Sequence, residues 1–150
     1  MGSPSENIRS ARVRAGLQPE DVARAAGVNK SSYYDVEASD DEVTGNISVA
    51  TLRAIACCLG TTALELLEGP GANTNRNNRP ISDLVMLAKA RMAADHVAVE
   101  AYSDRLGWNV APILEDPRRV EEYPFDMLQA LCDDCGADWK QFLDDSTSPG

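Results

Sequence analysis

The sequence predicts an all-α protein built from two tandem five-helix units. Aromatic residues make up only 5% of the chain, and Val and Ile never gather into the alternating runs that are typical of strands. Apolar residues recur instead at helical spacing in the first half, and a weaker copy of the same pattern recurs in the second half. A helical unit of about 60 residues is close to the lower size limit for independent stability, so two units that share surface would stabilise each other.

The first unit, residues 4–68, opens with two helices that end at glycines. Ser5 is expected to cap the first helix, which stops before Gly16. Pro19 lies in the first turn of the second helix, where its fixed φ is favourable, and the acids that follow it suit the positive end of a helix. Gly27 ends this second helix.

The remaining helices of the first unit have recognisable caps and inner faces. Asn29 caps a third helix of about two turns, in which Tyr33 and Val36 point inward at positions i and i+3. Ser48 caps the fourth helix. The inner faces of the fourth and fifth helices are predicted to contain Leu52, Ile55, Ala56, Leu59, Leu64, Leu66 and Leu67.

A linker and a second unit follow. Residues 69–80 combine Pro, Gly and Asn with no apolar periodicity, and this composition predicts a linker. The second unit, residues 81–145, has a short third helix that Pro117 stops. The final residues, 146–150, are expected to be disordered.

Three segments align the second unit with the first. Residues 88–91 correspond to 9–12, residues 103–109 to 23–29, and the chain from Phe125 to the chain from Val49. Each match is weak alone, but together they favour an internal duplication. The bulky aromatic residues expected to point inward in the second unit are Trp108, Trp139 and Phe142.

A set of residues at fixed spacing extends through the first unit: Ile8, Arg12, Gly16, Leu17, Val22, Ala23, Gly27, Val28, Tyr33, Val36, Glu37, Leu52, Ile55, Ala56, Leu59, Gly60, Leu66 and Leu67. This pattern resembles the Cro-like, XRE-type helix-turn-helix family of phage and bacterial repressors. The second unit resembles a degenerate copy of the same pattern. The resemblance implies a repressor-like fold in each unit, with the third helix of the first unit as the recognition helix in the major groove of DNA.

The resemblance also assigns residues to DNA binding. Repressors of this family read bases through outward side chains near the start of the third helix, and they anchor on phosphates around the start of the second helix. The residues carried over in this way are Arg14, Gln18, Lys30, Ser31, Tyr34 and Asp35. Arg12 and Glu37 match an internal ion pair that joins the first helix to the third, which is a structural role.

The charge of the chain departs from what DNA binding requires. The net charge is −10, whereas non-specific affinity for DNA comes mostly from cations that displace counterions. Pro19 stands where the family places a phosphate-binding Gln, and acids follow Glu37 where a polar or basic loop is expected. DNA binding would therefore depend on a local basic patch, for which the candidates are Arg9, Arg12, Arg14, Arg24 and Lys30.

An acidic protein-binding surface is the competing interpretation of the same residues. In the third helix of the second unit, Ile113 and Leu114 would form an apolar face with an acidic rim, which suits a protein partner better than a duplex. The alternative is that these two side chains fill the contact between the two units. The predicted partner-binding set is Asp40, Asp41, Glu42, Ile113, Leu114, Glu115 and Asp116.

The sequence offers little for catalysis, metal binding or a cofactor. His96 is the only histidine, and a position near the start of a helix favours a solvated residue. Cys132 and Cys135 have the spacing of redox and zinc motifs, but no second pair lies at a suitable distance, and Cys57 and Cys58 are expected to pack. No apolar run approaches the roughly 18 residues of a membrane span, so a soluble cytoplasmic protein is expected.

Two hypotheses for function follow, and neither is enzymatic. In the first, the chain is a transcription regulator in which the first unit reads DNA and the second serves dimerisation or binds a partner. In the second, the helix-turn-helix scaffold is reused by an acidic protein-binding antitoxin, immunity protein or inhibitor that does not bind DNA. A protein partner is expected under both hypotheses, and a homodimer is left open.

Overall fold

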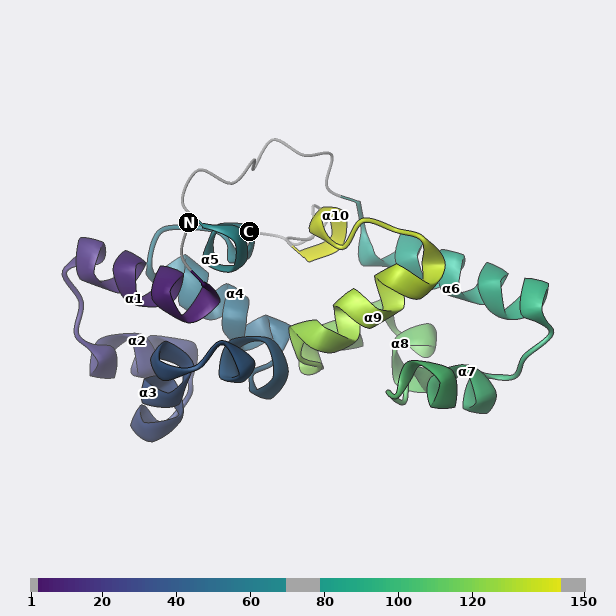
Figure 1. The fold of residues 1–150 in the computed structure, drawn as a ribbon, viewed down its shortest axis with the longest axis horizontal. Coiled ribbons are helices and arrows are strands. Elements are labelled where there is room, and N and C mark those ends of the chain that lie inside the picture. Colours follow the sequence, from purple (N-terminus) through teal and green to yellow (C-terminus); the bar gives the residue numbers. More distant parts are fainter. Residues whose placement is uncertain (1–2, 70–78, 144–150) are drawn as a thin grey trace.

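The computed structural model describes residues 3–69 and 79–143, and these residues form helices joined by short loops (Figure 1). Within the two described ranges the extended pairing is limited to a single bridge between Ser48 and Pro124. The all-α prediction is therefore confirmed. No helix in these ranges is both long enough and apolar enough to cross a membrane.

The first half contains five α-helices and one π-helical turn. Their bounds are α1 (Pro4–Ala15), α2 (Pro19–Ala26), α3 (Lys30–Ala38), the π-helical turn η1 (Glu42–Asn46), α4 (Val49–Cys58) and α5 (Ala63–Glu68). Gly27 ends α2 with a φ of 74°, a left-handed value that favours glycine. Asn29 and Ser48 cap α3 and α4 by accepting hydrogen bonds from the backbone N–H groups three residues on.

The start of α1 differs from the prediction. Ser5 does not cap the helix but lies inside its first turn, where it is 7% exposed. Pro4 is the first helical residue, because its fixed φ suits that position and its missing N–H needs no partner there. The residue that precedes the helix, Ser3, makes no capping hydrogen bond with its side chain.

The second half repeats this order of elements. Their bounds are α6 (Ile81–Asp95), α7 (Val99–Leu106), α8 (Ala111–Glu115), the 3₁₀ helix η2 (Pro117–Glu122), α9 (Phe125–Cys135) and α10 (Lys140–Leu143). His96 ends α6 with a φ of 56°. The expectation that His96 lies near the start of a helix is therefore corrected, since it occupies the left-handed position that closes one.

The first residues of corresponding helices show which positions of the two halves are equivalent, and this comparison needs fewer offsets than the sequence alignment. Pro19 and Val99 open α2 and α7 and lie 80 positions apart, whereas Val49 and Phe125 open α4 and α9 and lie 76 apart. The second half is therefore four residues shorter around α8, which explains its short third helix. In this register Met92, rather than Arg91, corresponds to Arg12. The internal duplication stays a prediction, since it rests on this shared order alone.

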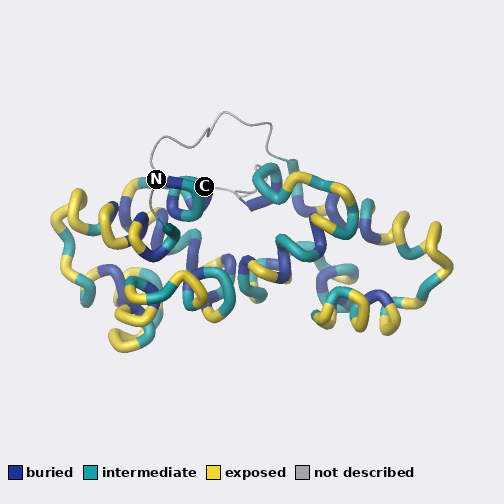
Figure 2. Tube along the Cα trace, viewed as in Figure 1, coloured by how far each residue is buried: buried dark blue, intermediate teal, exposed yellow. Residues whose placement is uncertain are grey.

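One hydrophobic cluster extends through both halves. Tyr33, Leu52 and Ile55 are fully buried in the first half, and Tyr102 and Leu131 are fully buried in the second. Figure 2 shows buried segments along α4 and α9, in the middle of the molecule. Burial of this apolar surface is the main stabilising contribution to the fold.

The contacts between the halves are reciprocal. Helix α4 packs against η2 while α9 packs against η1, and α5 packs against α10. The N-termini of α4 and α9 meet at the centre of the molecule, where the Val49 N–H donates to the Tyr123 carbonyl at 2.8 Å (Figure 1). Each half thus presents the same elements to the other, as the subunits of a two-fold symmetric dimer do.

Polar side chains also join the halves. Arg53 of α4 donates from Nε to the Leu143 carbonyl at 2.7 Å, and its Nη1 pairs with the Glu121 carboxylate. Lys140 of α10 pairs with Glu68 of α5, with 2.6 Å between Nζ and Oε1. Both interactions lie beside the apolar contact and fix one half against the other.

The described ends of the predicted linker are held in place. Gly69 is buried, and the Arg79 N–H donates to the Gln141 carbonyl at 2.8 Å. Arg79 also donates from Nε to Asp83 at 3.3 Å. The middle of the linker and the tail predicted for 146–150 lie outside the described residues.

Candidate nucleic-acid interface

An ion pair between α1 and α3 sets the position of α3. Arg12 donates from Nε to Glu37 Oε2 at 2.6 Å and from Nη2 to Oε1 at 3.1 Å, so the pair predicted from the sequence is present. The hydrogen bond to Glu37 raises the pKa of Arg12 above its ordinary value. Only 14% of the Arg12 side chain is exposed, so Arg12 does not contribute to the predicted basic patch. Its role is to hold α1 and α3 together.

The outer face of α3 consists of the residues predicted to read bases. Lys30, Ser31, Tyr34 and Asp35 point away from the core, half-exposed or exposed, whereas Tyr33 and Val36 are buried. Tyr34 is 45% exposed, which is unusual for a large side chain without an external contact. The structure therefore brings four of the six predicted DNA-binding residues together on one exposed surface.

Glu20, at the start of α2, lies against this surface. Its Oε1 is 3.0 Å from Lys30 Nζ and accepts a hydrogen bond from the Tyr34 hydroxyl at 3.4 Å. Lys30 Nζ also lies 5.9 Å from the centre of the Tyr34 ring. The hydrogen bond between the two charged groups lowers the pKa of Glu20 and raises the pKa of Lys30. Lys30 is thus paired with an acid of the same domain, a contact that the sequence analysis does not predict.

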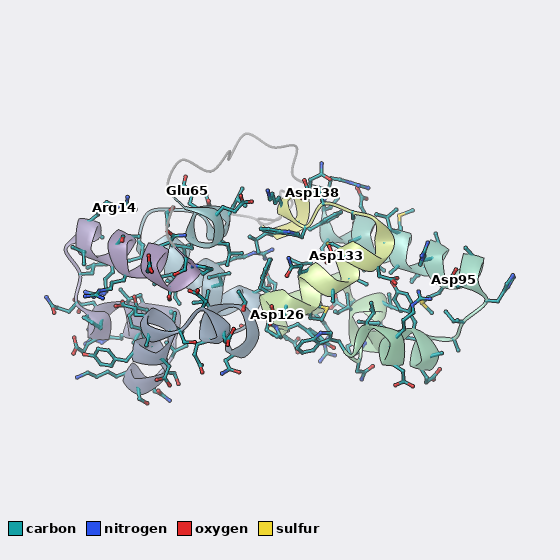
Figure 3. All side chains as sticks on the ribbon, viewed as in Figure 1. Arg14, Glu65, Asp95, Asp126, Asp133 and Asp138 are labelled. Carbon is teal, nitrogen blue, oxygen red and sulfur yellow. The ribbon has the colours of Figure 1, made fainter. Side chains whose placement is uncertain are left out.

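Gln18 and Arg14 occupy different surroundings. The backbone N–H of Gln18 donates to Asp21 at 3.1 Å, and the exposed Gln18 side chain stands at the start of α2, where the resemblance places a phosphate contact. Arg14 instead lines a shallow hollow of about 490 Å³ on the outside of α1, together with Glu6, Arg9, Ser10 and Val13. In Figure 3 Arg14 lies at the upper edge of the first half, while α3 lies at its lower edge. The structure therefore does not bring Arg14 to the α3 surface.

Two of the three acids that follow α3 form hydrogen bonds with other residues of the same domain. Asp40 accepts hydrogen bonds from the Ser5 N–H at 2.9 Å and from the Ser5 hydroxyl at 2.7 Å, so it caps the start of α1 from a distant loop. Glu42 accepts from the Asn46 amide at 2.8 Å. Asp40 is exposed although one of its carboxylate oxygens is engaged with α1, so its contact with a partner stays a prediction. Asp41 is exposed.

A pH-dependent stability test follows from Asp40. Hydrogen bonds from Ser5 lower the pKa of Asp40 in the folded protein, so its ionised form stabilises the fold above the unfolded pKa of about 4. This contribution is lost as the pH falls through the lower folded pKa. We expect Asp40→Asn, which keeps an acceptor oxygen but removes the charge, to lower the free energy of unfolding by about 0.5 kcal/mol at neutral pH and by much less at about pH 2. Urea unfolding at both pH values measures the difference, and Asp41→Asn, with little effect at either pH, is the matched control.

The prediction of an exposed apolar face on the third helix of the second half is wrong. Ile113 is fully buried, because it occupies the register position of Tyr33 and faces the core of its own half. Leu114 is half-buried against the same core. Helix α8 packs on α6, α7 and η2, so these side chains do not fill the contact between the halves either. Asp116 pairs with Arg118 at 3.2 Å, whereas Glu115 is exposed.

The cysteines and the histidine do not form a chemical site in the described ranges. No group of three or more His, Cys, Asp or Glu side chains there is placed to hold a metal ion. Cys132 is fully buried, and burial raises the pKa of its thiol to about 12, far from that of a reactive thiolate. Cys135 Sγ lies 3.4 Å from the Tyr102 hydroxyl.

Comparison with protein families gives one match. The helix-turn-helix family model HTH_3 matches residues 8–66, which extend from α1 through α5 and include the exposed face of α3. These residues form an HTH_3 domain. The same comparison detects no second copy, so the second half follows the order of elements without matching the family. No curated protein matches the sequence.

The HTH_3 domain identifies α2, the following turn and α3 as one structural motif. In this domain α2 and α3 are the helix-turn-helix pair, with Gly27 and Asn29 in the turn between them. The contact of Glu20 with Lys30 therefore joins the first turns of the two helices that the motif places against DNA.

Proposed function

We propose that this chain is a non-enzymatic bacterial or phage transcription regulator of the XRE type. Its HTH_3 domain reads DNA through α3, and its second half serves as a partner-binding or dimerisation module. The observation that supports this most is the exposed outer face of α3, at which Lys30, Ser31 and Tyr34 are free of any packing role. Gln18, at the start of α2, supplies a phosphate contact, and Asp35 faces the base edges.

The second half takes no part in reading DNA under this proposal. Helix α8 has five residues where α3 has nine, so it offers a shorter outer face. Its helix-turn-helix surface carries acids where a duplex would require cations. A single reading helix per chain implies a single half-site, or two half-sites bound by two chains.

Selection from fragmented genomic DNA tests the proposal. We expect the purified chain to enrich a short common sequence that survives moderate salt. Lys30→Ala should weaken binding to that sequence about fivefold and reduce the slope of log affinity against log salt by about 0.9. Arg14→Ala removes the same charge from the far side of the domain, so it should change the affinity less than twofold. Equal effects of the two variants would indicate unspecific charge attraction.

A second candidate function is favoured by the ion pair between Lys30 and Glu20. With Glu20 bonded to Lys30, and Arg12 bonded to Glu37, the α3 side of the HTH_3 domain has lost two of its cations to internal pairs. An acidic antitoxin, immunity protein or inhibitor that covers a basic protein needs no free cation there. Absence of any enriched DNA, together with one co-purifying basic protein, would establish this function instead.

A further inference from the structure

The second half contains a hollow at the place where the HTH_3 domain has its helix-turn-helix surface. It has a volume of about 510 Å³ and lies between α7 and α8. Residues from the first turn of α7, its last turn and the following loop line it, and those used below are Glu100, Ser103, Asp104, Trp108 and Asn109. By the register of the helix starts, Asp104 stands where the first half has Arg24, and Trp108 stands where it has Val28.

Two carboxylates in this hollow have no partner among the described residues. Glu100 and Asp104 are exposed, and no described side chain forms an ion pair or hydrogen bond with either. Asp95 and Asp134 differ from them, because both are paired with an arginine within the fold. Asp95 lies 2.9 Å from Arg105, at the outer end of the second half in Figure 3, and Asp134 lies 3.2 Å from the same guanidinium. The hollow thus carries two negative charges that no described side chain of the protein neutralises.

An indole borders the two carboxylates. Trp108 is half-buried: it packs against the hydrophobic core and also lines the hollow. The face of an indole attracts a cation more strongly than any other aromatic side chain does. A guanidinium or ammonium group in the hollow would therefore meet two carboxylates and an aromatic surface at once.

The loop that carries Trp108 is fixed before any ligand binds. The Trp108 N–H donates to the Ser103 carbonyl at 3.2 Å, and the Val110 N–H donates to the Ser103 hydroxyl at 3.1 Å. The Tyr123 hydroxyl, directly after η2, donates to the Asn109 carbonyl at 2.6 Å. Because the loop is held from both sides, a ligand would not have to order it, and less of the binding free energy would be lost.

From these features we infer that the hollow between α7 and α8 binds an arginine or lysine side chain of a partner protein. The inference rests on the proposed role of the second half as a partner-binding module, and it names the chemistry of that partner. The net charge of −10 would add long-range attraction for a basic segment and speed its capture. The same charges exclude a phosphate from this surface.

Fluorescence of Trp108 tests the inference with an acetylated tetra-arginine peptide. In a Trp139→Phe background, Trp108 is the single tryptophan of the chain, and the ring that meets Phe125 edge to face is kept aromatic. We expect a saturable change in emission at physiological salt. Glu100→Gln with Asp104→Asn should raise the half-saturating concentration at least fivefold, an order-of-magnitude figure for the loss of two close charge contacts.

Glu6→Gln with Asp133→Asn is the matched control, because it removes two exposed acids that lie outside the hollow, on α1 and α9. We expect this variant to change half-saturation less than twofold. Equal weakening by the two double variants, or no saturable change in emission, would overturn the inference. DNA binding is measured separately with Lys30→Ala, so loss of the DNA function and loss of the peptide site give different results.

Discussion

Replacement of Arg53 by alanine is expected to lower the free energy of unfolding by about 2 kcal/mol, because several acceptors lose their donor at once. Arg53 donates to the Leu143 and Phe142 carbonyls at the end of α10, and it pairs with Glu121 of η2. Only 18% of its side chain is exposed, so water replaces these contacts poorly. Since the contacts cross between the halves, thermal unfolding should also lose cooperativity.

Calorimetry provides the measurement. For a domain of this size a loss of about 2 kcal/mol corresponds to a fall in Tm of about 6 °C. Arg53→Lys keeps the charge but not the forked donor, so it should restore only part of the stability. Arg119→Ala removes an arginine that pairs with the exposed Glu122 three residues on, and it should leave the Tm almost unchanged. A fall in Tm as small for Arg53→Ala as for Arg119→Ala would show that the contact between the halves does not depend on Arg53.

Replacement of Glu20 by glutamine is expected to strengthen DNA binding about tenfold at moderate salt, because it removes an acid from the face that approaches phosphates and frees Lys30. Each added net cation at the phosphates should also steepen the slope of log affinity against log salt by about 0.9. Glutamine keeps the length of the side chain and can still accept from the Tyr34 hydroxyl, so α2 and α3 should keep their positions.

Titration of the enriched DNA sequence at several salt concentrations measures both effects. Glu115→Gln is the control, since it removes one exposed acid from α8 in the second half. A tenfold gain from Glu115→Gln as well would mean that net charge alone sets the affinity. An unchanged affinity for Glu20→Gln would place the DNA elsewhere than at the first turns of α2 and α3.

Much of the fold could be predicted because its signals are local. Asn29 and Ser48 cap helices through their own side chains, and Gly27 supplies a left-handed φ that other residues adopt at a cost. Tyr33 and Val36 are inward because the helical period places them there. Each of these features depends on residues within about one helical turn, so the chain order alone is enough to find them.

The parts that could not be predicted depend on contacts between distant segments. Asp40 binds Ser5 across 35 positions, and Glu20 meets Lys30 only because the turn at Gly27 folds α3 back onto α2. The sequence predicts Ile113 on an outer apolar face, whereas it occupies the register position of Tyr33 and is fully buried. An acid in the first turn of α2 was the one local sign that the reading face carries its own counter-charge.

Helix α4 packs on η2, and α9 packs on η1 in the same way. This packing within one chain affects how the occupancy of a DNA site would depend on the concentration of the protein in a cell. In a dimer of separate chains, dilution separates the subunits, and the active species falls with the square of the concentration when monomers dominate. Here the two partners share one backbone, so their encounter is intramolecular and does not weaken on dilution. A regulator that binds a single half-site as one chain would respond in simple proportion to its own synthesis, whereas binding of two half-sites by two chains would restore a threshold.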